Sequence, residues 1–131
     1  MTPQDSKILR ALVAIAWADR RIAKEETRAL ETLFHAFGAT EAEAKELRAY
    51  ASRSKSLSDV PLDELSDEDR EILLGNAAVL TAADGKRSDE EAKALDELVK
   101  LLGLDASKAK GVIDDAKDGA FLLPSRQLED G

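Results

Sequence analysis

Residues 82–91 read Ala-Ala-Asp-Gly-Lys-Arg-Ser-Asp-Glu-Glu, and this stretch decides the fold because it ends one helix and starts the next. Asp84-Gly85 predicts a helix end, since glycine tolerates the left-handed conformation in which many helices finish. Ser88 and Glu91 have the spacing of a capping box, in which each side chain accepts a hydrogen bond from the other residue's backbone N–H. We therefore expect two helices joined by a short acidic turn.

The apolar residues around this turn recur with the spacing of helices. The helix before it, about residues 67–84, and an earlier one at about residues 5–19 are apolar nearly all round. Helices of that kind are packed on several sides, so we expect these two to pack against each other at the centre. Further helices are expected after the turn at residues 20–24, after the capping box at residues 40–43, after Ser88 and over residues 106–117. The fold class is all-α, a bundle of six to seven helices without a strand, in which residues 58–65 form a loop or one short turn.

The sequence contains an internal repeat. A shift of 65 positions lays residues 18–38 onto residues 83–103 with eight identities in 21 positions. The identical residues of the first copy are Ala18, Asp19, Glu25, Glu26, Ala29, Leu30, Leu33 and Gly38. A shared Asp, Glu pair and closing Gly exceed the chance similarity of two amphipathic helices. We predict one domain over residues 1–131, built from two pseudo-symmetric helix–turn–helix units at about 2–55 and 66–118. In the C-terminal tail, residues 119–131, the apolar part at 120–124 is expected to dock on the core and the last residues to fray.

The composition excludes several function classes. A net charge of −8 and a pI near 4.7 repel nucleic acid and anionic lipid. The chain has no cysteine and one histidine, His35, which excludes thiolate and multi-histidine metal sites. The N-terminus lacks the pattern of a signal peptide, and no apolar run approaches the roughly 20 residues that span a bilayer. We expect a cytoplasmic protein whose partners are other proteins, without nucleic acid and without membrane insertion.

The stretch at residues 82–91 and the apolar residues after it resemble the A-A-D-G-x-x-S-x-E-E signature of the TerB, or tellurite-resistance, family. The first copy, residues 17–26, resembles the family's earlier A-x-A-D-G-x-I motif. It departs from that motif with Arg20 in place of glycine and Ala23 in place of a capping Ser or Thr. The resemblance implies an all-α fold, an association with bacterial stress and tellurite-resistance systems, a divalent-cation site, and use of the module beside other domains.

Helical spacing points two carboxylates of each unit toward the core. Asp84 continues the apolar stripe of the helix before the second turn, and Glu91 begins the stripe of the helix after it. Asp19 and Glu26 repeat this arrangement in the first unit. Ionised carboxylates at an apolar edge need compensation, which the N–H groups opening the next helix can supply. One interpretation is therefore structural, with Asp84 bracing the turn and Glu91 capping the helix.

The other interpretation is a hard divalent cation, Mg²⁺ or Ca²⁺, held at the turns. Its ligands would be Asp84 and Glu91, with Asp19 and Glu26 as the weaker pair. The second turn is favoured because Gly85 can adopt a positive φ, whereas Arg20 resists that conformation and adds a positive charge. The loop is not an EF-hand, since Glu91 arrives at position 8 and that loop needs its glutamate at position 12.

Two functions follow from these interpretations. The first is a non-catalytic interaction or scaffold module, for which we assign no catalytic residue and no organic cofactor, because the sequence has no nucleophile elbow and no glycine-rich phosphate loop. The alternative is a metal-dependent enzyme in which Asp84 and Glu91 hold a cation that activates water; an ion-buffering protein would share that site. An enzyme requires a concave pocket beside these carboxylates, and a binding module an exposed apolar or acidic surface. Trp17 is expected to be a core or groove aromatic and His35 a solvated residue.

Overall fold

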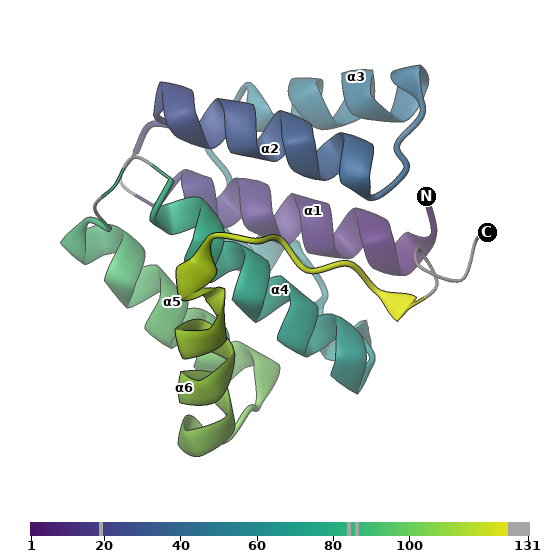
Figure 1. Ribbon diagram of the computed structural model, residues 1–131. Coiled ribbons are helices and arrows are strands. Elements are labelled where there is room, and N and C mark those ends of the chain that lie inside the picture. Colours follow the sequence, from purple (N-terminus) through teal and green to yellow (C-terminus); the bar gives the residue numbers. More distant parts are fainter. Residues whose placement is uncertain (19, 84, 86, 126–131) are drawn as a thin grey trace.

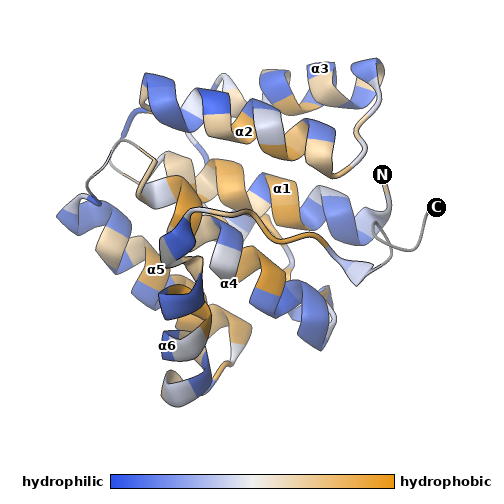
Figure 2. Cartoon of the chain, in the orientation of Figure 1, coloured by the Kyte–Doolittle hydropathy of each residue, from blue (hydrophilic) through white to orange (hydrophobic). Residues whose placement is uncertain are grey.

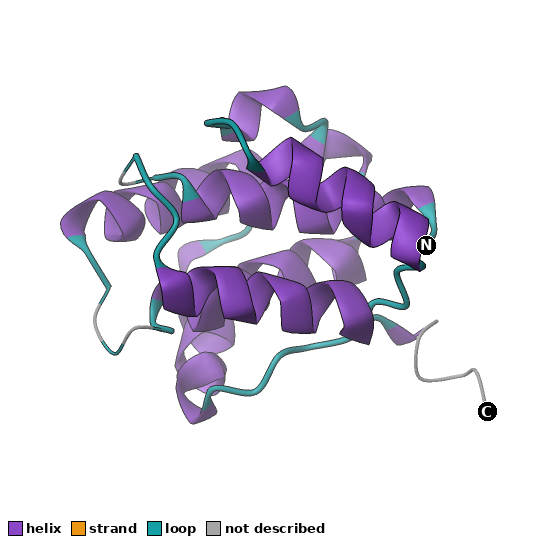
Figure 3. Cartoon of the chain, turned by 90° about the horizontal axis from the view of Figure 1, so that it is seen from above, coloured by secondary structure: helices purple, strands orange, loops and turns teal. Residues whose placement is uncertain are grey.

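The computed structural model describes residues 1–18, 20–83, 85 and 87–125. Within these residues the chain forms six α-helices and three 3-10 turns and contains no strand (Figures 1 and 3). The α-helices are α1 (Pro3–Ala16), α2 (Lys24–Ala36), α3 (Glu41–Ala51), α4 (Asp67–Thr81), α5 (Asp89–Leu102) and α6 (Ala106–Asp115), and the 3-10 turns are η1 (Leu57–Asp59), η2 (Leu62–Glu64) and η3 (Ala116–Asp118). None of these helices is long and apolar enough to cross a membrane.

The helices α1 and α4 form the centre of the bundle. They pack against each other more extensively than any other two helices, α2 and α3 cover α1, and α5 and α6 pack on α4 (Figure 1). Residues 11–16 of α1 and 72–81 of α4 are buried without exception. Figure 2 shows apolar residues along these two helices and polar residues on the outward sides of the others. The prediction that these two apolar helices lie at the centre is confirmed.

The first turns of both central helices are closed by buried carboxylates. At α1, Thr2 Oγ1 accepts a hydrogen bond from Asp5 N–H at 3.1 Å, and Asp5 Oδ2 accepts one from Thr2 N–H at 3.0 Å. At α4, Ser66 Oγ accepts from Asp69 N–H at 3.2 Å and donates to Asp69 Oδ2 at 2.9 Å. Asp5 is 0% exposed and Asp69 is 1% exposed. The caps therefore satisfy helix N–H groups at places that solvent hardly reaches.

Two side chains fix the linker between the two halves of the chain. The Gln4 amide donates to Glu64 O at 2.9 Å and accepts from Ser66 N–H at 3.0 Å, so the start of α1 is joined to the start of α4. The guanidinium of Arg70 binds main-chain oxygens of η2, of the residue after it and of the last turn of α5. These oxygens belong to Asp63, Leu65 and Leu102.

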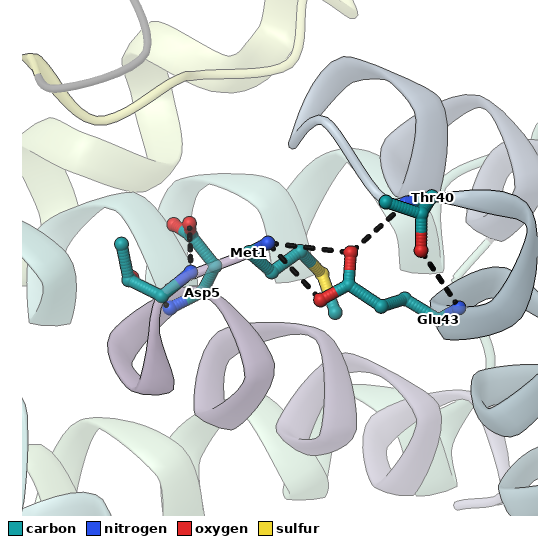
Figure 4. Close-up of polar contacts among 5 residues, drawn as sticks. Met1, Asp5, Thr40 and Glu43 are labelled. Carbon is teal, nitrogen blue, oxygen red and sulfur yellow. Dashed lines mark hydrogen bonds and ion pairs between the residues drawn. The ribbon is translucent and has the colours of Figure 1, made fainter.

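The cap of α3 joins this helix to the start of the chain (Figure 4). Thr40 N–H donates to Glu43 Oε1 at 2.9 Å and Glu43 N–H donates to Thr40 Oγ1 at 3.1 Å, which confirms the capping box expected there. The amino group of Met1 lies 3.1 Å from Glu43 Oε2. The backbone hydrogen bond from Thr40 and the bond from the Met1 amino group hold the pKa of the Glu43 carboxyl below its usual range. Its contribution to stability is therefore present above the ordinary carboxyl pKa and is lost as the pH falls through the lowered value.

The repeat recurs in the hydrogen bonds that end the helices. Arg20 after α1 and Gly85 after α4 lie 65 positions apart, and each donates its N–H to the carbonyl oxygen three residues earlier at 2.9 Å. Gly38 after α2 and Gly103 after α5 have φ values of 76° and 68° and donate in the same way, at 3.0 and 3.1 Å. These equivalences support a duplication, and the superposition of the two whole units by a pseudo-twofold operation stays a prediction.

Some element ends differ from the sequence prediction. α1 ends at Ala16 and α4 at Thr81, three residues before the expected ends. The N–H groups of Ala18 and Ala83 bond to carbonyls three rather than four residues back, which closes each helix in a tighter turn. The linker holds two 3-10 turns where a loop or one short turn was expected, and α6 passes into η3 after Asp115. The apolar residues after Gly119 dock on α4 as expected, whereas the prediction of fraying at residues 126–131 falls outside the described residues.

The central pair gives the first testable prediction. Leu12 and Leu73 are fully buried, so replacing either with alanine removes a packed side chain and leaves a cavity. We expect the free energy of unfolding, measured by urea denaturation, to fall by about 2–5 kcal/mol. Leu101→Ala is the control, since Leu101 is 49% exposed and its replacement should change stability by about 0.5 kcal/mol or less. Equal losses at Leu101 and Leu12 would contradict the central position of α1.

Candidate functional site

The second acidic turn ends in a complete helix cap. Ser88 N–H donates to Glu91 Oε1 at 3.0 Å, and Glu91 N–H donates to Ser88 Oγ at 3.1 Å. Glu91 is 2% exposed and occupies the first turn of α5, where the helix dipole favours a negative charge. The capping box that the sequence predicted here is confirmed, and Glu91 has a structural role.

The first acidic turn holds half of such a cap. Glu26 Oε1 accepts a hydrogen bond from Ala23 N–H at 3.2 Å, and Glu26 is 2% exposed. Ala23 is the N-cap residue of α2 but has no side-chain oxygen, so the return bond to the Glu26 N–H is missing. The first turn therefore lacks the hydroxyl oxygen that Ser88 supplies in the second turn, while the inward glutamate remains.

The other two predicted site residues, Asp19 and Asp84, lie outside the described residues. Their expected hydrogen bonds to the turns, and their pairing with Glu26 and Glu91 as metal ligands, therefore stay predictions. Among the residues that the structure describes, no three His, Asp or Glu side chains are grouped so that they could hold a metal ion. His35 is exposed on α2, as expected.

Arg20 differs from its sequence prediction. Its φ is 72°, in the left-handed region, and the equivalent Gly85 has a φ of 89°. The expectation that Arg20 would keep the first turn out of this conformation was wrong, because both copies of the turn have the same backbone shape. A side chain in that region costs roughly 1–2 kcal/mol, which the packing of α1 and α2 on either side of the turn must outweigh.

Arg87 has a role that the sequence did not reveal. Its Nε donates to Thr81 Oγ1 at 2.8 Å and its Nη2 donates to Ala78 O at 2.9 Å, so the guanidinium caps the C-terminal end of α4. A cation there also complements the helix dipole. The equivalent residue of the first unit is Ile22, a half-buried residue that packs against the core. The sequence pattern carries no signal that the partner of Arg87 is the preceding helix.

Two hollows flank the acidic turns. The first, called here the α4–α6 hollow, has a volume of about 570 Å³. Its lining residues are Ala78, Val79, Ala82, Ala83, Arg87, Ile113, Ala116, Gly119 and Phe121. Among the lining residues that the structure describes, Arg87 is the one with an ionisable side chain. Glu91 points instead into its own cap, so this hollow beside the second turn has an apolar floor.

The second hollow, the α2–α3 groove, has a volume of about 460 Å³ and is lined by Trp17, Arg21, Ile22, Thr27, Leu30, Phe34, Arg48, Ala51 and Ser52. Trp17 Nε1 donates to Ala51 O at 3.1 Å, which confirms a core or groove aromatic. At the rim, the Arg48 hydrogen bonds lower the pKa of the Glu31 carboxyl. The groove is therefore apolar inside and charged at its edge.

The two turns give a prediction about backbone strain. Arg20→Gly removes the conformational cost of a side chain at positive φ, but it also raises the conformational entropy of the unfolded chain. We expect a net gain in the free energy of unfolding of about 0.5–1 kcal/mol. Gly85→Ala should lose about 1 kcal/mol for the opposite reason, because a Cβ there meets no atom within 4 Å and its cost is conformational. Urea denaturation of both variants measures these changes, and a loss of stability in Arg20→Gly would contradict the shared turn shape.

Comparison with known proteins places this architecture in a family. The family model described as "Tellurite resistance protein TerB" matches residues 5–112, which run from the first turn of α1 into α6. Comparisons with curated proteins and with solved structures give no significant match. The family match spans most of the chain and includes both acidic turns. The chain therefore belongs to the TerB family.

Proposed function

We propose that this chain is a non-catalytic interaction module that acts through other proteins in a bacterial stress or tellurite-resistance response. Membership of the TerB family supports the biological setting. The observation that carries the proposal is the position of Glu26 and Glu91, the described members of the two inward-pointing carboxylate pairs. Both are 2% exposed and both accept hydrogen bonds from helix N-caps, so neither faces a hollow where a substrate would bind.

The hollows favour binding over chemistry. General acid–base catalysis needs a titratable group within hydrogen-bond reach of the reacting atoms. The α4–α6 hollow offers Arg87 among its described lining residues, and that guanidinium is bound to Thr81 and Ala78. A third hollow, about 510 Å³ between α5 and α6, combines an apolar floor with charged residues at its edge. Apolar floors with charged rims are typical of surfaces that bind proteins.

Cation binding is the finer proposal, and the described residues test its fit only in part. Glu91 is the one described member of the favoured pair, and its Oε1 already accepts the Ser88 N–H. A cation at this turn would have to share that carboxylate with the cap. The described residues do not complete a ligand set, so we derive no chemistry from a metal here.

A thermal titration decides the cation question. A cation that binds only the folded chain stabilises it by mass action, so millimolar Mg²⁺ or Ca²⁺ is expected to raise the Tm. Glu91→Gln should abolish that rise and Glu26→Gln should keep it, because the second turn is the favoured site. Glu90→Gln removes the same charge from an exposed neighbour and is the control. No rise in Tm up to tens of millimolar would leave Glu91 with its capping role alone.

Complementation distinguishes an interaction module from a metal-dependent enzyme. A strain that lacks this gene is expected to lose tellurite tolerance and to regain it with the wild-type chain. Glu91→Gln should restore tolerance as well, at a temperature where the variant is folded. The substitution weakens the helix cap and lowers the free energy of unfolding by about 1 kcal/mol. Survival on tellurite is the measurement, again with Glu90→Gln as the control.

Two results would contradict this proposal. A folded Glu91→Gln chain that fails to complement, beside a Glu90→Gln chain that succeeds, would favour the enzyme with a cation at Asp84 and Glu91. Unchanged tellurite tolerance of the deletion strain would remove the stress assignment.

A further inference from the structure

A segment after α6 lies along α4. Residues 119–125, called here the C-terminal strap, cross α4 from its C-terminal end toward its N-terminal end (yellow in Figure 1). In the middle, Leu122 N–H donates to Asn76 Oδ1 at 2.7 Å and Asn76 Nδ2 donates to Leu122 O at 3.0 Å. At the end, the N–H and the hydroxyl of Ser125 both donate to the Glu68 carboxylate. One buried amide thus binds the N–H and C=O of a single strap residue, as a neighbouring β-strand would.

The sequence of α4 is adapted to this contact. Gly75 and Asn76 are poor helix formers, yet they lie side by side in the middle of a buried helix. Asn76 is 0% exposed, and a buried amide is costly unless it is hydrogen-bonded. A Cβ at Gly75 would lie 2.5 Å from Leu122 Cδ1, so the absence of a side chain lets the Leu122 side chain lie directly over α4. Both residues are explained by a chain segment that lies over them.

The strap and the helix beneath it differ in their relation to the family. α4 lies inside the span that matches the TerB family model, residues 5–112, whereas the strap begins at residue 119, outside it. The helix that carries Gly75 and Asn76 therefore lies within the matched span, and the segment that covers it lies beyond that span.

The strap does not fill the surface that it covers. The Leu122 side chain remains 43% exposed, while Phe121 and Leu123 are half-buried and Pro124 is buried. The α4–α6 hollow, about 570 Å³, lies open beside the first strap residues and is lined by Gly119 and Phe121. A peptide that replaced the strap and carried larger side chains at the Gly119 end would also fill this hollow. It would then contact both α4 and α6.

We propose that this surface, called here the strap site, binds an extended peptide segment of a partner protein. The C-terminal strap occupies the same site and competes with that segment from within the chain. The strap site comprises Gly75, Asn76 and the α4–α6 hollow. The partner segment presents a main-chain N–H and C=O to Asn76, an apolar residue over Gly75, and a Leu-Pro pair after it, as the strap does. This inference deepens the proposed function and rests on it, because it names the surface and the class of partner.

Competition follows from the tether. A strap joined to α6 has an effective concentration in the millimolar range, so a free segment with the same contacts binds weakly to the wild-type chain. A partner displaces the strap by adding contacts in the α4–α6 hollow. Any change that releases the strap must therefore raise the affinity for a free segment.

The test uses the full chain and a capped peptide of the strap sequence, Gly-Ala-Phe-Leu-Leu-Pro-Ser. Leu122→Pro removes the N–H that Asn76 accepts and so releases the strap. In an NMR titration, the amides of residues 72–80 of this variant should shift on peptide addition, with a Kd at least about tenfold lower than for wild type. Adding Asn76→Leu should remove binding, and a control peptide with proline at the Leu122 position should not bind.

Three results would overturn the proposal. The first is equal peptide affinity of the wild-type and Leu122→Pro chains. The second is no peptide binding by a Leu122→Pro chain that keeps the wild-type circular dichroism spectrum. The third is a wild-type dimer that Leu122→Pro dissociates, because the strap of a second copy would then be the occupant. A second measurement uses wild type alone: saturating peptide should speed hydrogen exchange of the Leu122 amide, and unchanged exchange despite binding would place the peptide elsewhere. Complementation by Glu91→Gln is independent of all these outcomes, so failure here leaves the proposed function standing.

Discussion

The contact between α1 and α4 buries both helices, so water cannot hydrogen-bond to the backbone groups that have no partner within either helix. The outer helices exist to cover the sides of this pair: α2 and α3 on α1, α5 and α6 on α4. The helix starts need another solution, because the first N–H groups of any helix lack partners within it. The chain supplies that solution from its own acidic side chains, and the buried Asp5 and Asp69 are the consequence.

Carboxylates also cap the starts of the outer helices, and this role accounts for part of the acidic composition. Glu26, Glu43 and Glu91 each accept the N–H of the residue three positions earlier, so much of what the sequence offers as a cluster of carboxylates is committed to helix starts. A carboxylate held in that way is a poor candidate for a reacting group. The apolar hollows and the strap on α4 are therefore better candidates for the functional surface than the acidic turns.

The sequence could predict the features that local chemistry determines. Capping boxes at Thr40 and Ser88 and the central position of the two most apolar helices follow from short-range patterns, and both predictions are confirmed. Arg20 was mispredicted because local propensity disfavours a left-handed arginine, while the packing of the whole bundle imposes the turn. Asn76 and Arg87 could not be found, since the partner of each is fixed by the tertiary fold rather than by spacing.

The central claim is that Glu91 stabilises the second turn as a cap. A double-mutant cycle of Ser88→Ala and Glu91→Gln, followed by urea denaturation in EDTA, measures this most directly. The reciprocal hydrogen bonds predict a coupling of about 0.5–1.5 kcal/mol that persists without metal. A coupling of zero in EDTA that appears only when Mg²⁺ or Ca²⁺ is added would show that Glu91 acts as a ligand, and would contradict the account.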